Sequence, residues 1–219
     1  YHSLHWLQYS ELQLGHGAEA ARLLAALRAD EKAGSSKRTR PHLVAMRATY
    51  VVALGTWDHE VARFEVSLDG LEPAPACAEL YVRGRAALDR GDAEAARAAL
   101  AAMAEHRGPL ETLVAQGASA ASCCSPTTRS SYIPGRLAAH VMELELGGLI
   151  ALAAGAEEEG LTQLGAAAEK EDALGYDFGP PVVVEPAHEL LGHVLLARGH
   201  RAEAGRAHPV LLDPVDVQN

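Results

Sequence analysis

The sequence predicts an all-α protein, an α-solenoid built from about five helix-turn-helix hairpins. The first observation is composition: hydrophobic residues make up 48% of the 219 residues and aromatic residues only 5%. Such an alanine-rich, aromatic-poor chain favours helix. The second is a repeat, because apolar residues at three- and four-residue spacing end at a glycine five times. The third is the scarcity of strand patterns, since Val182–Val184 is the only candidate and it follows two prolines.

Five glycines mark the turns of the repeat. They are Gly15, Gly55, Gly91, Gly155 and Gly199. A glycine after an apolar helix supplies the left-handed conformation that ends the helix. Most intervals between them are close to a two-helix repeat of about 34 residues plus an insertion. The interval between Gly91 and Gly155 is longer and therefore predicts an extra segment.

The hairpins follow one another as a single domain across residues 1–219. They cover about residues 2–28, 42–69, 76–106, 136–172 and 185–208. A polar linker precedes Pro41, and proline is tolerated in the first turn of the next helix because its missing N–H has no intrahelical partner there. The third hairpin is the cleanest copy. Residues 117–131 are small and polar without a period, so we expect a flexible insertion that contains Cys123 and Cys124.

The fifth hairpin shows the helical stripe most clearly. Its apolar positions are Ala187, Leu190, Leu191, Val194 and Leu195. They recur at three- and four-residue spacing and therefore form one buried face that ends before Gly199. Alanines after the turn allow a second helix to pack closely.

Small residues also stand where the two helices of each repeat should touch. They are Gly84, Gly148 and Gly192 before the turn, and Ala20, Ala96 and Ala204 after it. With the turn glycines, this pattern resembles the tetratricopeptide repeat (TPR), whose hairpins stack into a right-handed superhelix. Segments such as His2–Tyr9 and Gly179–Gly192 further resemble the C-terminal half of a bacterial TPR family of unassigned biochemistry.

The resemblance implies a concave groove lined by the first helix of each hairpin. Applied to this chain, the family's groove positions are His2, His5, Tyr9, His42, Thr49, Tyr81, Arg85, Glu145, Glu189 and His193. We therefore expect a scaffold that binds a peptide or protein partner in this groove. The alternative is a metal-dependent or small-molecule enzyme whose site forms where His2, His5 and Glu189 approach one another.

Cofactor and metal chemistry are only weakly indicated. His2 and His5 lie one helical turn apart, a spacing that can hold a divalent transition metal. No phosphate-binding loop, nucleophile elbow or Cys-x-x-Cys motif occurs in the sequence, so the expectation is no cofactor. Three cysteines are too few for a disulfide framework.

Charge and hydropathy exclude two classes of partner. The net charge of −10 and the lack of a basic stripe argue against nucleic acid. No apolar run approaches the roughly 20 residues of a membrane span. Residue 1 is a tyrosine already inside a helical pattern, so we expect residues upstream. The compartment stays open, with a soluble cytoplasmic location favoured over export. Self-association, or docking of an N-terminal half, is a further expectation.

Overall fold

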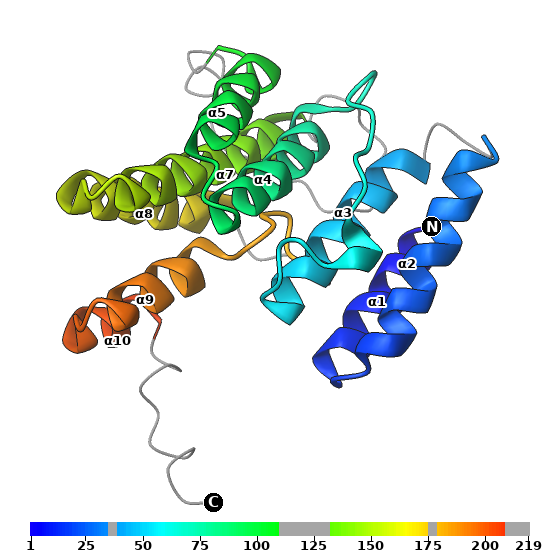
Figure 1. Cartoon of the computed structure of the whole chain (residues 1–219), viewed down its shortest axis with the longest axis horizontal. Coiled ribbons are helices and arrows are strands. Elements are labelled where there is room, and N and C mark those ends of the chain that lie inside the picture. The colour runs from blue at the N-terminus through cyan, green and yellow to red at the C-terminus, as the bar shows by residue number, and fades with distance from the viewer. Residues whose placement is uncertain (35–38, 110–131, 175–178, 209–219) are drawn as a thin grey trace, which may run out of the picture.

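The computed structural model describes residues 1–34, 39–109, 132–174 and 179–208, and in these ranges the protein consists of helices without a strand (Figure 1). The α-helices are α1 (His2–Gln13), α2 (Gly17–Lys32), α3 (Thr39–Leu54), α4 (Pro73–Asp89), α5 (Ala93–Arg107), α7 (Tyr132–Ala153), α8 (Glu157–Glu171), α9 (Ala187–Ala197) and α10 (Arg201–Ala207). Two 3-10 turns, η1 (Glu60–Ala62) and η2 (Asp172–Leu174), complete the elements of these ranges. The predicted all-α class is confirmed. No helix in the described part of the chain combines the length and apolar character needed to cross a membrane.

Four antiparallel helix pairs correspond to predicted hairpins. They are α1 with α2, α4 with α5, α7 with α8, and α9 with α10. Each turn contains one of the predicted glycines with a positive φ, for example 77° at Gly15 and 84° at Gly199. Because residues with a Cβ atom rarely adopt this backbone conformation, glycine ends these helices without strain. The predicted insertion at 117–131, with Cys123 and Cys124, lies outside the described residues.

The second hairpin differs from its prediction. Its first helix is α3, but residues 57–69 do not form the expected second helix: they contain only the turn η1 followed by irregular chain. The backbone of this segment is bonded by buried side chains instead. Arg47 donates from Nε to the carbonyl oxygen of Ala62 at 2.8 Å, and Glu79 accepts from the N–H of Val66 at 3.0 Å.

Arg47 and Glu79 also form an ion pair with each other, with side chains 6% and 1% exposed. Arg83 adds a second cation to Glu79 and donates to the carbonyl oxygen of Val66 at 2.8 Å. Buried backbone groups need partners, and here charged side chains of α3 and α4 provide them in place of a helix. The prediction of a helix at 57–69 was therefore wrong because long-range contacts override the local repeat.

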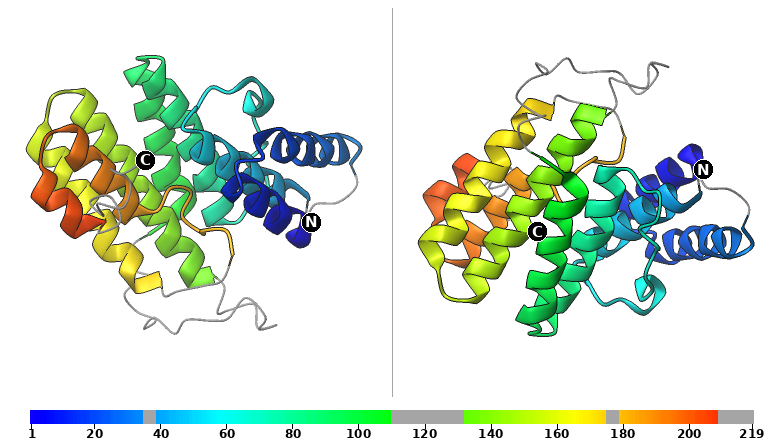
Figure 2. Two further views of the ribbon diagram at one scale, coloured as in Figure 1. Left: turned by 90° about the horizontal axis from the view of Figure 1, so that it is seen from below. Right: turned by 90° about the horizontal axis from the view of Figure 1, so that it is seen from above.

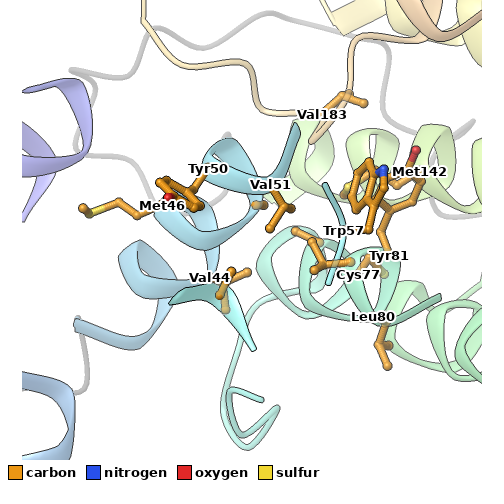
Figure 3. Close-up of a cluster of buried hydrophobic side chains, with 14 of the residues drawn as sticks. Val44, Met46, Tyr50, Val51, Trp57, Cys77, Leu80, Tyr81, Met142 and Val183 are labelled. Atoms are coloured by element: carbon orange, nitrogen blue, oxygen red, sulfur yellow. The ribbon is translucent and has the colours of Figure 1, made fainter. Parts of the chain in front are cut away.

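The helices pack in chain order, and the first helices of the first four units lie beside one another, whereas α9 packs against α8 (Figure 2). Thus α1 contacts α3, α3 contacts α4, and α4 contacts α7. Small residues allow close approach: a Cβ at Gly84 would lie 2.5 Å from Leu146, and one at Gly148 would lie 2.9 Å from the carbonyl oxygen of Gly160. The buried cluster drawn in Figure 3 spans α3, α4 and α7.

A non-helical segment, residues 179–186, lies against the first helices before α9 begins. We call it the strap. At one end Gly179 lies against the indole of Trp6, because a Cβ there would be 2.4 Å from the ring. In the middle Val183 is 2% exposed and joins the core cluster (Figure 3). At the other end Glu185 accepts a hydrogen bond from the hydroxyl of Tyr81 at 3.0 Å. The strap therefore spans from α1 to α4.

Candidate functional site

A cavity of about 310 Å³ lies between α1, α3, the start of α4 and the strap. Most of its wall is apolar and consists of alanine, valine and proline side chains with Trp6. Its polar groups come from three histidines and one threonine: His2, His5, His42 and Thr49. None of the described residues that line it is Asp, Glu, Lys or Arg. We call this cavity the histidine pocket.

Helix geometry explains why these four side chains meet. His2 and His5 lie one turn apart on α1, and His42 and Thr49 lie two turns apart on α3, so each pair shares one face of its helix. The two helices pack side by side. The structure therefore brings together four of the ten residues that the repeat pattern placed in a groove.

The hydrogen bonds of Thr49 define the tautomer of His5. The hydroxyl of Thr49 donates its one hydrogen to the carbonyl oxygen of Ala45 at 2.9 Å. The Nε2 atom of His5 lies 3.2 Å from the same hydroxyl oxygen, which can then only accept. In this arrangement Nε2 of His5 carries hydrogen and donates, which leaves a lone pair on Nδ1.

Two histidines of the pocket, His5 and His42, have a lowered pKa. Burial, together with the neighbouring His42 and His2, lowers the pKa of His5 to about 4. Burial also lowers the pKa of His42, with contributions from nearby positive charge including His2. The imidazole of His5 is therefore neutral near pH 7. In a protein whose net charge is −10, the described wall of this pocket thus lacks a carboxylate.

A second group of predicted groove residues meets the other end of the strap. Tyr81 and Arg85 of α4 both bind Glu185: the Tyr81 hydroxyl donates at 3.0 Å, and an Arg85 nitrogen lies 3.4 Å from the same carboxylate oxygen. The guanidinium of Arg85 also stacks 4.4 Å above the ring of Trp57. These side chains are thus covered by the chain's own strap, and Tyr81 is fully buried.

Glu145 of α7 lies in the same cluster and is fully buried. Neither of its carboxyl oxygens has a hydrogen-bond partner among the described residues. Burial raises its pKa well above the ordinary value, and the nearby carboxylates of Glu185 and Glu171 raise it further, although Arg85 lowers it. Glu145 is therefore held in its neutral form at the pH where exposed glutamates are charged. We call Tyr81, Arg85, Glu145 and Glu185 the strap cluster.

The remaining predicted groove residues do not join either group. Tyr9 is half-buried on α1, and on α9 Glu189 is half-buried and His193 is exposed. None of them lines the histidine pocket. The approach of Glu189 to His2 and His5 that the enzyme hypothesis requires is therefore not formed at this pocket.

Metal binding at His2 and His5 stays a prediction. In the described ranges no group of three or more His, Cys, Asp or Glu side chains is placed so that it could hold a metal ion. The Nε2 atom of His5 is also engaged with Thr49, so only Nδ1 could serve as a ligand without loss of that bond.

Sequence reasoning missed the strap and the ionic network of Arg47 and Glu79. The network had a signal: both charged residues stand among the apolar positions of their helices, where a charge requires a buried partner. The strap had a weaker one, the run Pro180–Val184 before Glu185. Nothing local identifies Tyr81 and Arg85 as its partners.

Comparison with protein-family models, with curated proteins and with solved structures finds no match to this chain. The pocket and the strap cluster therefore provide the observations for a functional proposal.

Proposed function

We propose that this chain is a TPR-like scaffold, a right-handed α-solenoid that binds a peptide or protein partner on the surface formed by its first helices. The packing order supports the solenoid part of the proposal. Each described helix contacts the described helix that follows it in sequence. The first helices α1, α3, α4 and α7 also contact one another in that order. This packing is expected when each hairpin buries its apolar face against the next.

The observation that carries the binding part is the histidine pocket. Three successive first helices contribute to its wall, which is mainly apolar with a few polar groups, the usual composition of a ligand site. Its volume of about 310 Å³ is at the lower end of the roughly 300–1,000 Å³ typical of such sites. This size suits one anchoring side chain of a partner.

The pocket is formed before any ligand arrives. Its floor consists of packed helices, and the strap is held at both ends, by Trp6 against Gly179 and by Tyr81 and Arg85 against Glu185. Binding therefore requires little ordering of the protein, which favours affinity. The exposed apolar side chains of Leu7 in α1 and of Leu14 directly after it leave self-association through the first hairpin as a separate prediction.

Selection of peptides from a random displayed library on the full-length chain tests the proposal. Enriched peptides should lose binding to Ala45→Trp, because Ala45 lines the pocket and the indole would fill it. Ala53→Trp is the matched control, since Ala53 is exposed on the same helix and does not line the pocket. A failure to enrich any peptide, or equal binding to both variants, would contradict a peptide site at this pocket.

A further inference from the structure

In the histidine pocket, the hydrogen bonds around His5 indicate which of its two ring nitrogens is an acceptor. The hydroxyl of Thr49 donates its hydrogen to the carbonyl oxygen of Ala45 and accepts from Nε2 of His5. The neutral ring of His5 therefore has its lone pair on Nδ1. That atom has no hydrogen bond to any residue in the described ranges. A ligand that reaches His5 must therefore donate a hydrogen bond if this atom is to be satisfied.

Ring-shaped side chains form much of the rest of the wall. The ring of Trp6 and the imidazoles of His2 and His42 stand with four prolines, Pro41, Pro75, Pro180 and Pro181. Flat aromatic groups pack well on aromatic faces, with a geometry that a branched aliphatic side chain does not share. The surface thus favours a planar ligand.

Charge narrows the ligand further. With no Asp, Glu, Lys or Arg side chain in the described wall, a charged group would lose its hydration without gaining a carboxylate, ammonium or guanidinium partner. An aliphatic side chain would fill the space but leave the Nδ1 atom of His5 without a partner. Tryptophan and tyrosine combine a flat apolar body with a single N–H or O–H donor.

We infer that the pocket recognises a tryptophan or tyrosine side chain of the partner peptide, and that Nδ1 of His5 accepts its N–H or O–H hydrogen bond. This inference rests on the proposed function. It assigns to His5 the selection of a donor-bearing ring and to the surrounding rings the selection of a planar one.

Two probes that differ at the indole nitrogen, N–H in one and N–CH3 in the other, test the inference on the full-length chain: N-acetyl-tryptophanamide and its indole-N-methylated derivative. A neutral hydrogen bond contributes a few-fold to tenfold in affinity, so the methylated probe should bind about three- to tenfold more weakly. The affinity is measured by titrating each probe into protein whose histidines are labelled with ¹⁵N and following the nuclear magnetic resonance spectrum. The Nδ1 resonance of His5 should shift with the first probe only.

His5→Phe keeps a ring but removes the lone pair, so the two probes should bind this variant equally. His106→Phe, on the exposed face of α5 and away from the pocket, should keep the wild-type preference. Equal affinity of the wild type for both probes, or a preference retained in His5→Phe, would overturn the inference. Library peptides that contain neither Trp nor Tyr, and that still lose binding in Ala45→Trp, would contradict the inferred aromatic anchor. The proposed scaffold function would stand in that case.

Free indole and the peptide Gly-Ala-Trp-Ala-Gly distinguish the source of the ring. Tighter binding of the peptide supports a partner side chain as the occupant. Indole that binds as tightly as the peptide would overturn that part of the inference and identify a small-molecule site.

Discussion

Glu79 and Glu145 are both fully buried glutamates on first helices, yet their surroundings differ completely. Glu79 binds two arginines, Arg47 and Arg83, and the N–H of Val66. Glu145 has no hydrogen-bond partner for either oxygen among the described residues. The comparison shows that burial of a carboxyl group can either organise a loop or store an unfavourable interaction, depending on the partners that the fold brings.

The largest expected effect on the free energy of unfolding comes from removing the charge of Glu79, the glutamate whose hydrogen bonds are satisfied. Glu79→Gln removes the charge that Arg47 and Arg83 share, and an unpaired buried charge costs about 3–5 kcal/mol of unfolding free energy. Denaturant unfolding followed by circular dichroism measures the loss. The double variant Arg47→Met with Glu79→Met should recover only part of it: neither charge is then buried alone, but the carbonyl oxygen of Ala62 and the N–H of Val66 lose their partners. A stable Glu79→Gln chain would show that the network does not hold residues 57–69.

Glu145→Met should have the opposite sign. Replacing an unsatisfied buried polar group by an apolar one of similar size should raise the free energy of unfolding at pH 7 by about 1–3 kcal/mol. The same unfolding measurement applies. Exposed Glu158→Met on α8 is the control and should change little. A destabilised Glu145→Met would indicate that Glu145 has a favourable partner.

The pH dependence sharpens this prediction. The folded state keeps the proton of Glu145, whereas the unfolded chain releases it above an ordinary pKa of 4.5. The folded state then binds more protons than the unfolded state, so this residue makes the protein less stable as pH rises from 4.5 toward the raised pKa. The advantage of Glu145→Met should therefore shrink toward pH 4.5 and grow above it. A difference that does not change with pH would contradict the neutral state of Glu145.

Glu185→Gln tests how the strap is held, and its expected effect on the free energy of unfolding is smaller than that of Glu79→Gln. It weakens the bonds from Tyr81 and Arg85, which should cost about 1–2 kcal/mol because hydrogen bonds to charged groups are stronger than neutral ones. It also removes a negative charge that raises the pKa of Glu145, so the decline of stability above pH 4.5 should end at a lower pH. Denaturation at several pH values measures both effects. An unchanged end point of the decline would show that Glu185 does not affect the pKa of Glu145.

The smallest effect is expected at the histidine pocket. Thr49→Val removes the acceptor for His5 and should cost about 0.5–1.5 kcal/mol, the range of a neutral hydrogen bond. Its more specific result is spectroscopic, because the hydrogen of the His5 imidazole is then no longer confined to Nε2. The ¹⁵N shifts of the two ring nitrogens should move toward each other. Unchanged shifts would refute the assigned tautomer.

Local patterns predicted what depends on local chemistry. All five turn glycines have positive φ, and the all-α class holds in the described ranges. The helix predicted at 57–69 was wrong because Arg47 and Glu79, distant in sequence, bind its backbone. His5 and Thr49 meet because helix periodicity fixes their faces. Tyr81 and Glu145 were predicted to line the same open groove. Instead, the strap, about a hundred residues after Tyr81 in sequence, covers Tyr81. No local sequence pattern indicates that contact.

The strap also changes how the array should lose structure. In an open stack of hairpins each unit contacts only its neighbours, so terminal units can unravel while the centre stays intact. Here residues close to the last hairpin lie against Trp6 in the first helix, and Val183 between them belongs to the central core. Detachment of α1 removes one anchor of the segment that leads into α9. The two ends of the stack are therefore coupled, and the protein should unfold more as a closed cooperative unit than as a series of fraying repeats.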